Sequence, residues 1–237
     1  MTKISLCRWT QQISHLHMHK QRTESVRIKF CGLTQADDVD HALALDVDEM
    51  GLVFAGRKRN IGIASAARLA AMAQNKLLVT GLFMNPAAAA VHEVLAQVAL
   101  DRLQFHGNES PEFCAGFGRP WIKAISAADC DDLPAAMQRW QPWQQQGLQA
   151  LLLDAHAGDK VGGSGERFDW SMVPRQRPLP IYLAGGLTAD NVAAAIVQVR
   201  PETVDVSSGI ETSPGRKCPD KMQAFVNEVK HVFESGQ

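Results

Sequence analysis

Several features that mark particular protein classes are missing from this 237-residue sequence. No apolar run approaches the roughly 18 residues that a transmembrane helix needs. The net charge is only −1, so there is no electrostatic reason to expect nucleic acid or a membrane surface as a partner. Aromatic residues make up 6%, which argues against a stacking platform for single-stranded nucleic acid. We therefore expect neither a nucleic-acid partner nor a membrane.

The cysteines do not form a disulfide framework. Their number is odd, and no two of them stand in a CxxC pattern. This usage is typical of a reduced protein, so we expect a cytoplasmic location. The five positions are Cys7, Cys31, Cys114, Cys130 and Cys218.

Residues 1–25 differ from the remainder of the chain. They are polar and basic, and they lack the continuous apolar segment of a secretory signal. His15, His17 and His19 with Cys7 could form a metal site, but we expect a disordered extension. A start at Met18 would explain the segment equally well.

Eight short apolar segments recur from Val26 onward, separated by helical patterns. They lack strict alternation, as strands buried on both faces do. The expected strands are Arg27–Cys31, Glu49–Phe54, Leu77–Met84, Arg102–Phe105, Trp121–Ile125, Ala150–Asp154, Pro180–Leu183 and Thr203–Val206. This repetition predicts an α/β protein, a single (β/α)₈ barrel of parallel strands over residues 26–237. A doubly wound open sheet is the alternative, but it usually carries a GxGxxG after its first strand, and none is present.

Four expected helices have recognisable signals. Asn85 is expected to cap a helix that begins at Pro86, Thr34 the first helix and Thr188 the seventh. The last helix presents one apolar face, formed by Met222, Phe225, Val226, Val229 and Phe233.

Two strands end on residues that can carry chemistry. Such barrels hold their active sites at the carboxyl ends of the strands. The first strand ends on Cys31, which is either a catalytic thiol or a buried core cysteine. The sixth ends on Asp154 after three leucines, where a carboxyl group pairs with a cation, caps a turn or transfers protons.

Three loops of small residues follow the sixth, seventh and eighth strands. They contain Gly162-Gly163-Ser164-Gly165, Gly185-Gly186 and Ser207-Ser208-Gly209. Gly163 and Gly185 are 22 positions apart, as are Gly185 and Ser207, so each loop falls at the same place in its repeat. Glycines are often only turn residues, but three loops in register predict a phosphate site built from backbone N–H groups.

Other polar residues stand near strand ends. Arg57, Lys58 and Arg59 follow the second strand, and one of them is expected to reach an anionic group, the alternative being a solvated loop. Gln104 and His106 flank the end of the fourth strand and are expected to contact substrate, although a lone histidine is more often structural. Lys123, on the fifth strand, is a further candidate for the site, but it could as easily pair with a carboxylate. Asp205, facing the barrel interior, needs a partner.

Taken in order, these motifs resemble the N-(5′-phosphoribosyl)anthranilate isomerase family of tryptophan biosynthesis. The resemblance covers residues 26–233, and the ordered combination of motifs is specific where each motif alone is weak. The matching stretches are Ile28 to Thr34, Arg59 before Ile61, Gln104 to Gly107, Asp154 with Gly162 to Gly165 and Phe168 to Trp170, Leu183 to Leu187, and Val204 to Glu211. Arg57-Lys58 stand where the family has Ser-Pro.

The resemblance implies an Amadori rearrangement by acid–base catalysis, with no cofactor and no metal. It places the general base on Cys31 and the general acid on Asp154. It further implies that Arg59 holds the anthranilate moiety, that the three small-residue loops hold the phosphate and that Asp205 lies near the substrate amine. The expected partner is a small phosphorylated substrate. The protein itself is expected to be a monomer or a homodimer.

Two kinds of alternative are distinguished by the strand ends. A histidine-pathway isomerase of this fold would have aspartate in place of Cys31, and indoleglycerol-phosphate synthase would use lysine and glutamate. A non-catalytic sugar-phosphate-binding barrel would keep the glycine loops but would not need Cys31 and Asp154 together.

Overall fold

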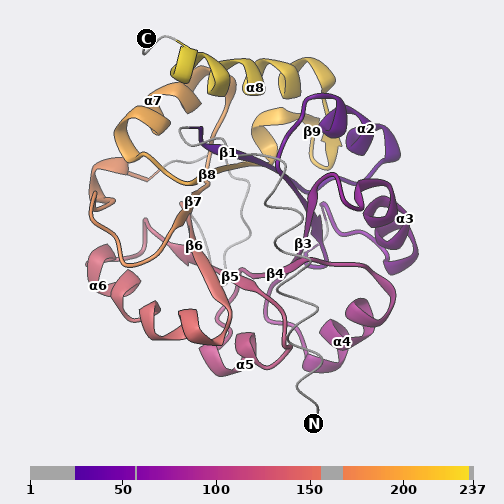
Figure 1. Ribbon diagram of the computed structural model, residues 1–237, viewed down its shortest axis with the longest axis horizontal. Coiled ribbons are helices and arrows are strands. Elements are labelled where there is room, and N and C mark those ends of the chain that lie inside the picture. Colours follow the sequence, from indigo (N-terminus) through magenta and orange to yellow (C-terminus); the bar gives the residue numbers. More distant parts are fainter. Residues whose placement is uncertain (1–24, 57, 156–167, 235–237) are drawn as a thin grey trace.

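The computed structural model describes residues 25–56, 58–155 and 168–234, which form a closed barrel of eight parallel strands. The strands follow one another around the barrel in chain order, and β8 pairs with β1 to close it (Figure 1). Their bounds are β1 Arg27–Cys31, β2 Glu49–Val53, β3 Leu78–Phe83, β4 Arg102–Phe105, β5 Trp121–Ser126, β6 Leu148–Asp154, β7 Ile181–Leu183 and β8 Thr203–Val206. The predicted fold class is confirmed, with strand ends shifted by no more than two residues.

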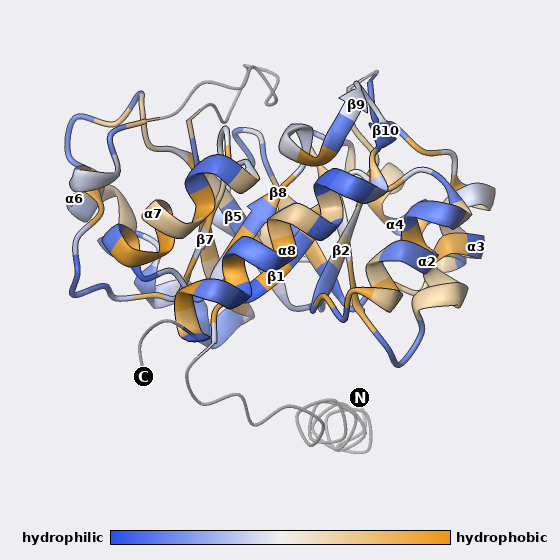
Figure 2. Ribbon diagram, turned by 90° about the horizontal axis from the view of Figure 1, so that it is seen from above, coloured by the Kyte–Doolittle hydropathy of each residue, from blue (hydrophilic) through white to orange (hydrophobic). Residues whose placement is uncertain are grey.

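Helices surround the barrel (Figure 1). Because they cover its outer face, the strands are buried on both faces. In Figure 2, hydrophobic and hydrophilic residues alternate along α7 and α8, as expected of amphipathic helices. The helices are α2 Ala36–Ala44, α3 Ile63–Ala73, α4 Ala88–Gln97, α5 Pro111–Ala115, α6 Leu133–Gln138, α7 Ala189–Val199 and α8 Pro219–Glu234. Three 3₁₀ turns are η1 Gln141–Gln146, η2 Trp170–Met172 and η3 Ser208–Ile210.

A small antiparallel hairpin interrupts the pattern between β8 and α8. It consists of β9, Glu211–Ser213, and β10, Arg216–Lys217. Gly215 at its turn has φ of 81°, a left-handed conformation that favours glycine. Figure 1 places the hairpin beside α2 at the edge of the barrel.

Two of the predicted helix caps are wrong. Asn85 has φ of 49° and lies before α4, whose N-cap is Ala87; its side-chain oxygen accepts from Asn108 N–H at 2.7 Å. Thr34 precedes the N-cap of α2, Gln35, and donates instead to Gly215 O at 2.9 Å. Both polar side chains are used in contacts between loops, which local sequence does not reveal.

The predictions for the last two helices are confirmed. Thr188 is the N-cap of α7, and its N–H donates to Asn191 Oδ1 at 3.0 Å. In α8 the predicted apolar residues Met222, Phe225 and Val229 are buried against the barrel.

The interior of the barrel is polar on one side and apolar on the other. On β1, β2 and β8, the neighbouring residues Lys29, Glu49 and Asp205 are all buried. Across the interior, β5, β6, β7 and the residue after β7 contribute a second hydrophobic cluster of Ile122, Ala124, Ala150, Leu152, Tyr182 and Ala184, from which the Tyr182 hydroxyl donates to Glu49 at 2.8 Å. Buried charges are costly unless paired, so the polar side is a network rather than a set of isolated groups.

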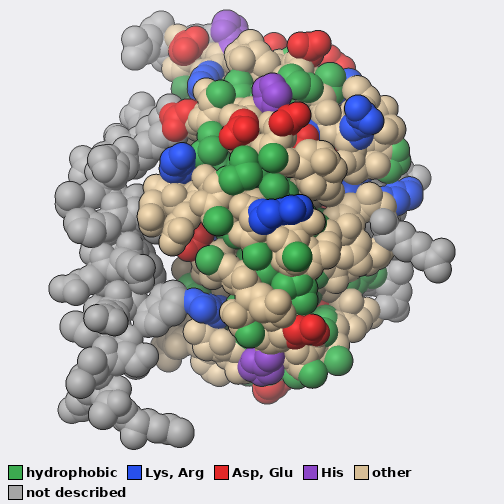
Figure 3. Space-filling model, turned by 90° about the vertical axis from the view of Figure 1, so that its right-hand side faces the viewer, with side chains coloured by type: hydrophobic (Ala, Val, Ile, Leu, Met, Phe, Trp, Pro, Cys, Tyr) green, Lys and Arg blue, Asp and Glu red, His purple; other side chains and the backbone are tan. Residues whose placement is uncertain are grey.

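The outer surface has an ordinary distribution of charge where it is drawn. On the face around α3, Lys and Arg side chains are scattered singly among acidic and apolar ones (Figure 3). Among the described helices, none is both long and apolar enough to cross a membrane.

Candidate active site

A pocket opens at the carboxyl ends of the strands and collects most of the predicted site residues. Eight strands ending at one rim bring together residues that are far apart in sequence. Its predicted lining residues are Cys31, Arg59, Gln104, His106, Asp154, Gly185, Gly186, Asp205, Ser207 and Ser208. Gly209 does not line it, and Gly162, Gly163, Ser164 and Gly165 lie outside the described residues.

Cys31 is the last residue of β1 and is almost fully buried. Gly51 on the neighbouring strand makes room for it, because a Cβ there would come within 2.9 Å of the sulfur. Burial raises the pKa of the Cys31 thiol above its ordinary value, while the positive charges of Lys29, Lys217 and Arg59 act in the opposite direction. The thiol is therefore a weak acid whose conjugate base is strong and held close to cationic groups.

Asp154 is the last residue of β6 and faces the same pocket from a strand not adjacent to β1. Its Oδ2 lies 3.5 Å from His106 Nε2. A Cβ at Gly185 would come within 2.9 Å of its Oδ1, so the turn after β7 packs closely against the carboxyl group. With 13% of its side chain exposed, Asp154 is reachable by a ligand but sheltered from bulk water.

A chain of polar contacts crosses the barrel below these two residues. Lys29 Nζ donates to Gln104 Oε1 at 2.5 Å and to Asp205 Oδ2 at 3.1 Å. Since Lys29 can only donate, it fixes the oxygen of the Gln104 amide toward itself and leaves the NH₂ for His106 Nδ1, 3.2 Å away. This contact favours the His106 tautomer whose proton is on Nε2, the nitrogen nearer Asp154.

Lys29 is the partner that Asp205 was expected to need. Burial alone would lower the pKa of Lys29, but Asp205, Cys31 and Glu49 outweigh it and raise that pKa. Asp205 Oδ1 has no hydrogen-bond partner within the described part of the chain although it is buried. Asp205 also lines the pocket, so an unsatisfied acceptor is available to a donor on a ligand.

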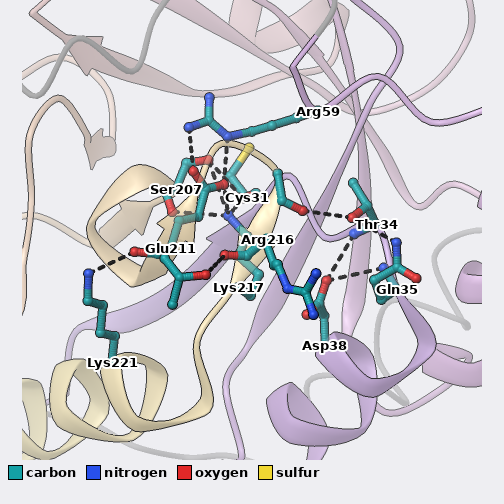
Figure 4. A network of polar contacts seen from close by, with 12 residues as sticks. Cys31, Thr34, Gln35, Asp38, Arg59, Ser207, Glu211, Arg216, Lys217 and Lys221 are labelled. Atoms are coloured by element: carbon teal, nitrogen blue, oxygen red, sulfur yellow. Dashed lines mark hydrogen bonds and ion pairs between the residues drawn. The ribbon is translucent and has the colours of Figure 1, made fainter.

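Arg59 is held by Glu211, the last residue of the matching stretch Val204 to Glu211, for which the sequence predicts no role. Glu211 accepts from Arg59 Nε and Nη2, both at 2.7 Å, and from Lys217 Nζ at 2.9 Å (Figure 4). Lys217 was missed entirely, because it lies in a hairpin with no sequence signal linking it to β1. Its Nζ also donates to Cys31 O at 2.7 Å.

The loops after β7 and β8 pack backbone against backbone. Gly185 and Gly186 have φ of 82° and 67°, conformations that L side chains rarely adopt. A Cβ at Gly209 would lie 1.9 Å from Leu187 O, so only glycine fits there. Turns of this kind expose backbone N–H groups, which is the property that the phosphate-site prediction requires.

The described residues contain no group of three or more His, Cys, Asp or Glu side chains that could hold a metal ion. The histidines at positions 15, 17 and 19 and Cys7 fall outside that part of the chain. Lys123, the other candidate, pairs with Glu109 Oε2 at 2.9 Å, the alternative that the sequence left open.

Fold and pocket together define the class of this protein, a TIM-barrel enzyme with an acidic group and a thiol at its strand ends. Residues 28–228 match the family model described as N-(5′-phosphoribosyl)anthranilate (PRA) isomerase. The chain belongs to this family of isomerases.

Relatives support the assignment over nearly the whole of their own length. The N-(5′-phosphoribosyl)anthranilate isomerase of Pseudomonas putida F1 is 42% identical, with 88% of this chain and 99% of that protein covered. The enzyme of that name from Chromohalobacter salexigens is 45% identical, with 90% and 96% covered. The solved phosphoribosyl anthranilate isomerase of Thermotoga maritima is 31% identical and superposes with a TM-score of 0.75, with 87% and 99% covered.

Proposed function

We propose that the protein converts N-(5′-phosphoribosyl)anthranilate into 1-(o-carboxyphenylamino)-1-deoxyribulose 5-phosphate, a step of L-tryptophan biosynthesis. Membership of the isomerase family supports this assignment. The observation that carries it is that Cys31 and Asp154, a base and an acid by type, line one pocket from separate strands. A barrel that only bound sugar phosphates would need neither.

In the proposed mechanism Asp154 acts first, as general acid. It protonates the furanose ring oxygen while the anthranilate nitrogen pushes the ring open to an iminium ion. The Cys31 thiolate then removes the proton from C2′, and the electron pair of that C–H bond neutralises the iminium to give an enolamine. The enolamine tautomerises to the ketone. The product has the same composition as the substrate, so the reaction is an isomerisation that needs no oxidant or reductant.

The remaining residues would bind the substrate. Arg59 would hold the anthranilate carboxylate, and Asp205, with its unsatisfied oxygen, would lie near the amine. Gln104 and His106 would contact the sugar from β4 and the residue that follows it. The loops at 162–165, 185–186 and 207–209 would hold the phosphate through backbone N–H groups.

A small phosphorylated substrate is the partner that we propose, with the cytoplasm as the site of action. The cysteine usage supports a reducing compartment. We expect the chain to act as a monomer or a homodimer; the Thermotoga maritima isomerase is dimeric, and monomers generated from it have been solved.

A fluorescence assay tests the reaction directly. Phosphoribosylanthranilate would be generated in place from anthranilate and phosphoribosyl pyrophosphate by a separate transferase, and its decay followed after addition of the purified protein. We expect the decay to be greatly accelerated. No acceleration by well-folded protein would refute the proposed reaction and point to a binding barrel or a histidine-pathway substrate.

The phosphate loops can be tested at Gly209. We expect Gly209→Ala to lower the free energy of unfolding by about 1–3 kcal/mol, because the methyl group forces two backbones apart. It should also weaken competitive inhibition by inorganic phosphate, as measured in the same assay. Gly62→Ala is the control, since a Cβ at Gly62 meets nothing within 4 Å. Unchanged phosphate inhibition in Gly209→Ala would show that this loop does not hold the anion.

A further inference from the structure

Three side chains near the mouth of the barrel, those of Lys217, Glu211 and Arg59, form a closed ring of contacts with the backbone at the end of β1 (Figure 4). Lys217 joins the end of β1 to Glu211, and Glu211 joins Lys217 to Arg59. Arg59 then returns to β1, because its Cδ would be 2.6 Å from a Cβ placed on Gly32. The ring thus begins and ends at the Cys31–Gly32 peptide.

Within this ring, Lys217 and Glu211 have partners for nearly all of their hydrogen-bond donors and acceptors. Lys217, whose side chain is 0% exposed, donates to Cys31 O, Ser207 O and Glu211 Oε1 at 2.7, 3.0 and 2.9 Å. These three shortest contacts match the three protons of an ammonium group, and Ser207 Oγ lies further away at 3.4 Å. Both carboxylate oxygens of Glu211 are occupied by Arg59, and one of them also by Lys217. Glu211 therefore has little freedom to rotate.

Arg59 is consequently held by one edge of its guanidinium group. Nε and Nη2 face Glu211, while Nη1 makes no hydrogen bond within the described residues, and Arg59 lines the pocket. A planar guanidinium that is fixed along one edge presents the other in a defined direction, which suits recognition of a second carboxylate. Without Glu211, the long side chain would lose this orientation and regain its rotamer freedom.

The electrostatics favour an ionised Glu211. Burial alone would raise its pKa, but the hydrogen bonds from Arg59 and the charge of Lys217 hold that pKa below its usual value. Burial lowers the pKa of Lys217, and the charge of Glu211 and its hydrogen bond to Lys217 act in the opposite direction. With Lys217 and Arg59 both protonated, two cations and one anion leave one net positive charge beside the pocket. That charge is what an anionic substituent of the substrate would meet.

We propose that Glu211, anchored by Lys217, is a positioning residue that aims Arg59 at the carboxylate of the substrate and so determines specificity for carboxylated aryl amines. The proposal rests on the proposed function, since it assigns the carboxylate of that substrate to Arg59. The hairpin β9–β10 is then part of the active site: it supplies both Glu211 and Lys217, and Gly215 at its turn contacts Thr34 and Lys58.

The test compares two ligands that differ only in the carboxylate. One is reduced 1-(o-carboxyphenylamino)-1-deoxyribulose 5-phosphate, the compound bound in a solved relative, and the other is the same molecule made from aniline. We expect Glu211→Gln to weaken binding of the carboxylated ligand about tenfold or more, equivalent to ~1.4 kcal/mol, and to leave binding of the aniline ligand unchanged. In an Arg59→Ala background, Glu211→Gln should have no further effect on either ligand.

A matched control separates positioning from stability. Glu109→Gln removes the charge of another buried Lys–Glu pair, also at 2.9 Å, whose residues do not line the pocket. It should lower the melting temperature without changing the ratio of the two affinities. If Glu211→Gln does not fold, Glu211→Asp serves instead, because its shorter side chain cannot reach both Arg59 nitrogens and Lys217 and should change the same ratio.

Each outcome has one meaning. Equal weakening of both ligands by Glu211→Gln, or effects of Glu211→Gln and Arg59→Ala that simply add, would overturn the positioning role. These measurements are made on protein whose wild type has first been tested for turnover of phosphoribosylanthranilate. Wild type that neither turns over this substrate nor binds either ligand would instead refute the proposed function.

Discussion

Cys31→Ser is expected to fold and to bind product analogues like the wild type while kcat falls about 10²–10⁴-fold, the usual contribution of a general base. Serine is nearly isosteric with cysteine, so the contacts at the end of β1 should persist. A hydroxyl, however, ionises far less readily than a thiol, and no strong base would remain at C2′. The measurement is single-turnover fluorescence decay beside isothermal binding of the reduced product analogue.

The pH dependence of the wild type follows from the same residue. Because burial raises the pKa of the Cys31 thiol, the thiolate fraction in the free enzyme is small at neutral pH and grows as pH rises. We therefore expect kcat/KM to increase with pH from the neutral into the alkaline range, and this increase to disappear in Cys31→Ser. Wild-type turnover in Cys31→Ser would remove Cys31 as the base.

A control variant for this experiment is available in the same chain. Cys114 is also buried, but it lies in α5 and does not line the pocket. Cys114→Ser should therefore leave kcat and its pH profile unchanged, apart from any loss of stability. An equal loss of kcat in both variants would mean that the effect of Cys31→Ser is structural.

The sequence could predict the barrel and the strand-end residues because both depend on local signals. Buried strands are short apolar runs, and in a parallel barrel their last residues must meet at one rim. Cys31 and Asp154 could therefore be placed in one pocket from the sequence alone, and the pocket contains both. Asp205 was likewise expected to need a partner, although the identity of that partner as Lys29 follows only from the pairing of β1 with β8.

The parts that the sequence could not predict depend on contacts between loops. Glu211 and Arg59 are 152 positions apart, and nothing in either segment encodes their pairing. Asn85 failed as a predicted cap for a related reason, since its side chain satisfies the loop that follows β4 rather than the helix after it. Polar side chains in loops have many possible local partners, and tertiary packing decides among them.

Asp154→Asn is the second variant for which we expect a loss of kcat of about 10²–10⁴-fold, here because the general acid is removed. Asparagine keeps the shape of the side chain, so the contact with the turn at Gly185 and the binding of product analogues should be retained. An amide cannot supply the proton that ring opening requires. The control is Asp132→Asn, at an exposed helix N-cap where Asn serves as well as Asp.

The order of the two chemical steps makes this prediction separable from that for Cys31. If Asp154 acts in ring opening and Cys31 in the later removal of the C2′ proton, substrate deuterated at C2′ should react with a primary isotope effect in Cys31→Ser. That effect should be suppressed in Asp154→Asn, because ring opening then limits the rate before any C2′–H bond breaks.

Two outcomes would contradict the role given to Asp154. An Asp154→Asn variant that binds substrate poorly but turns it over well would make Asp154 a binding residue only. A full isotope effect in Asp154→Asn would place its action at or after proton removal and reverse the proposed order.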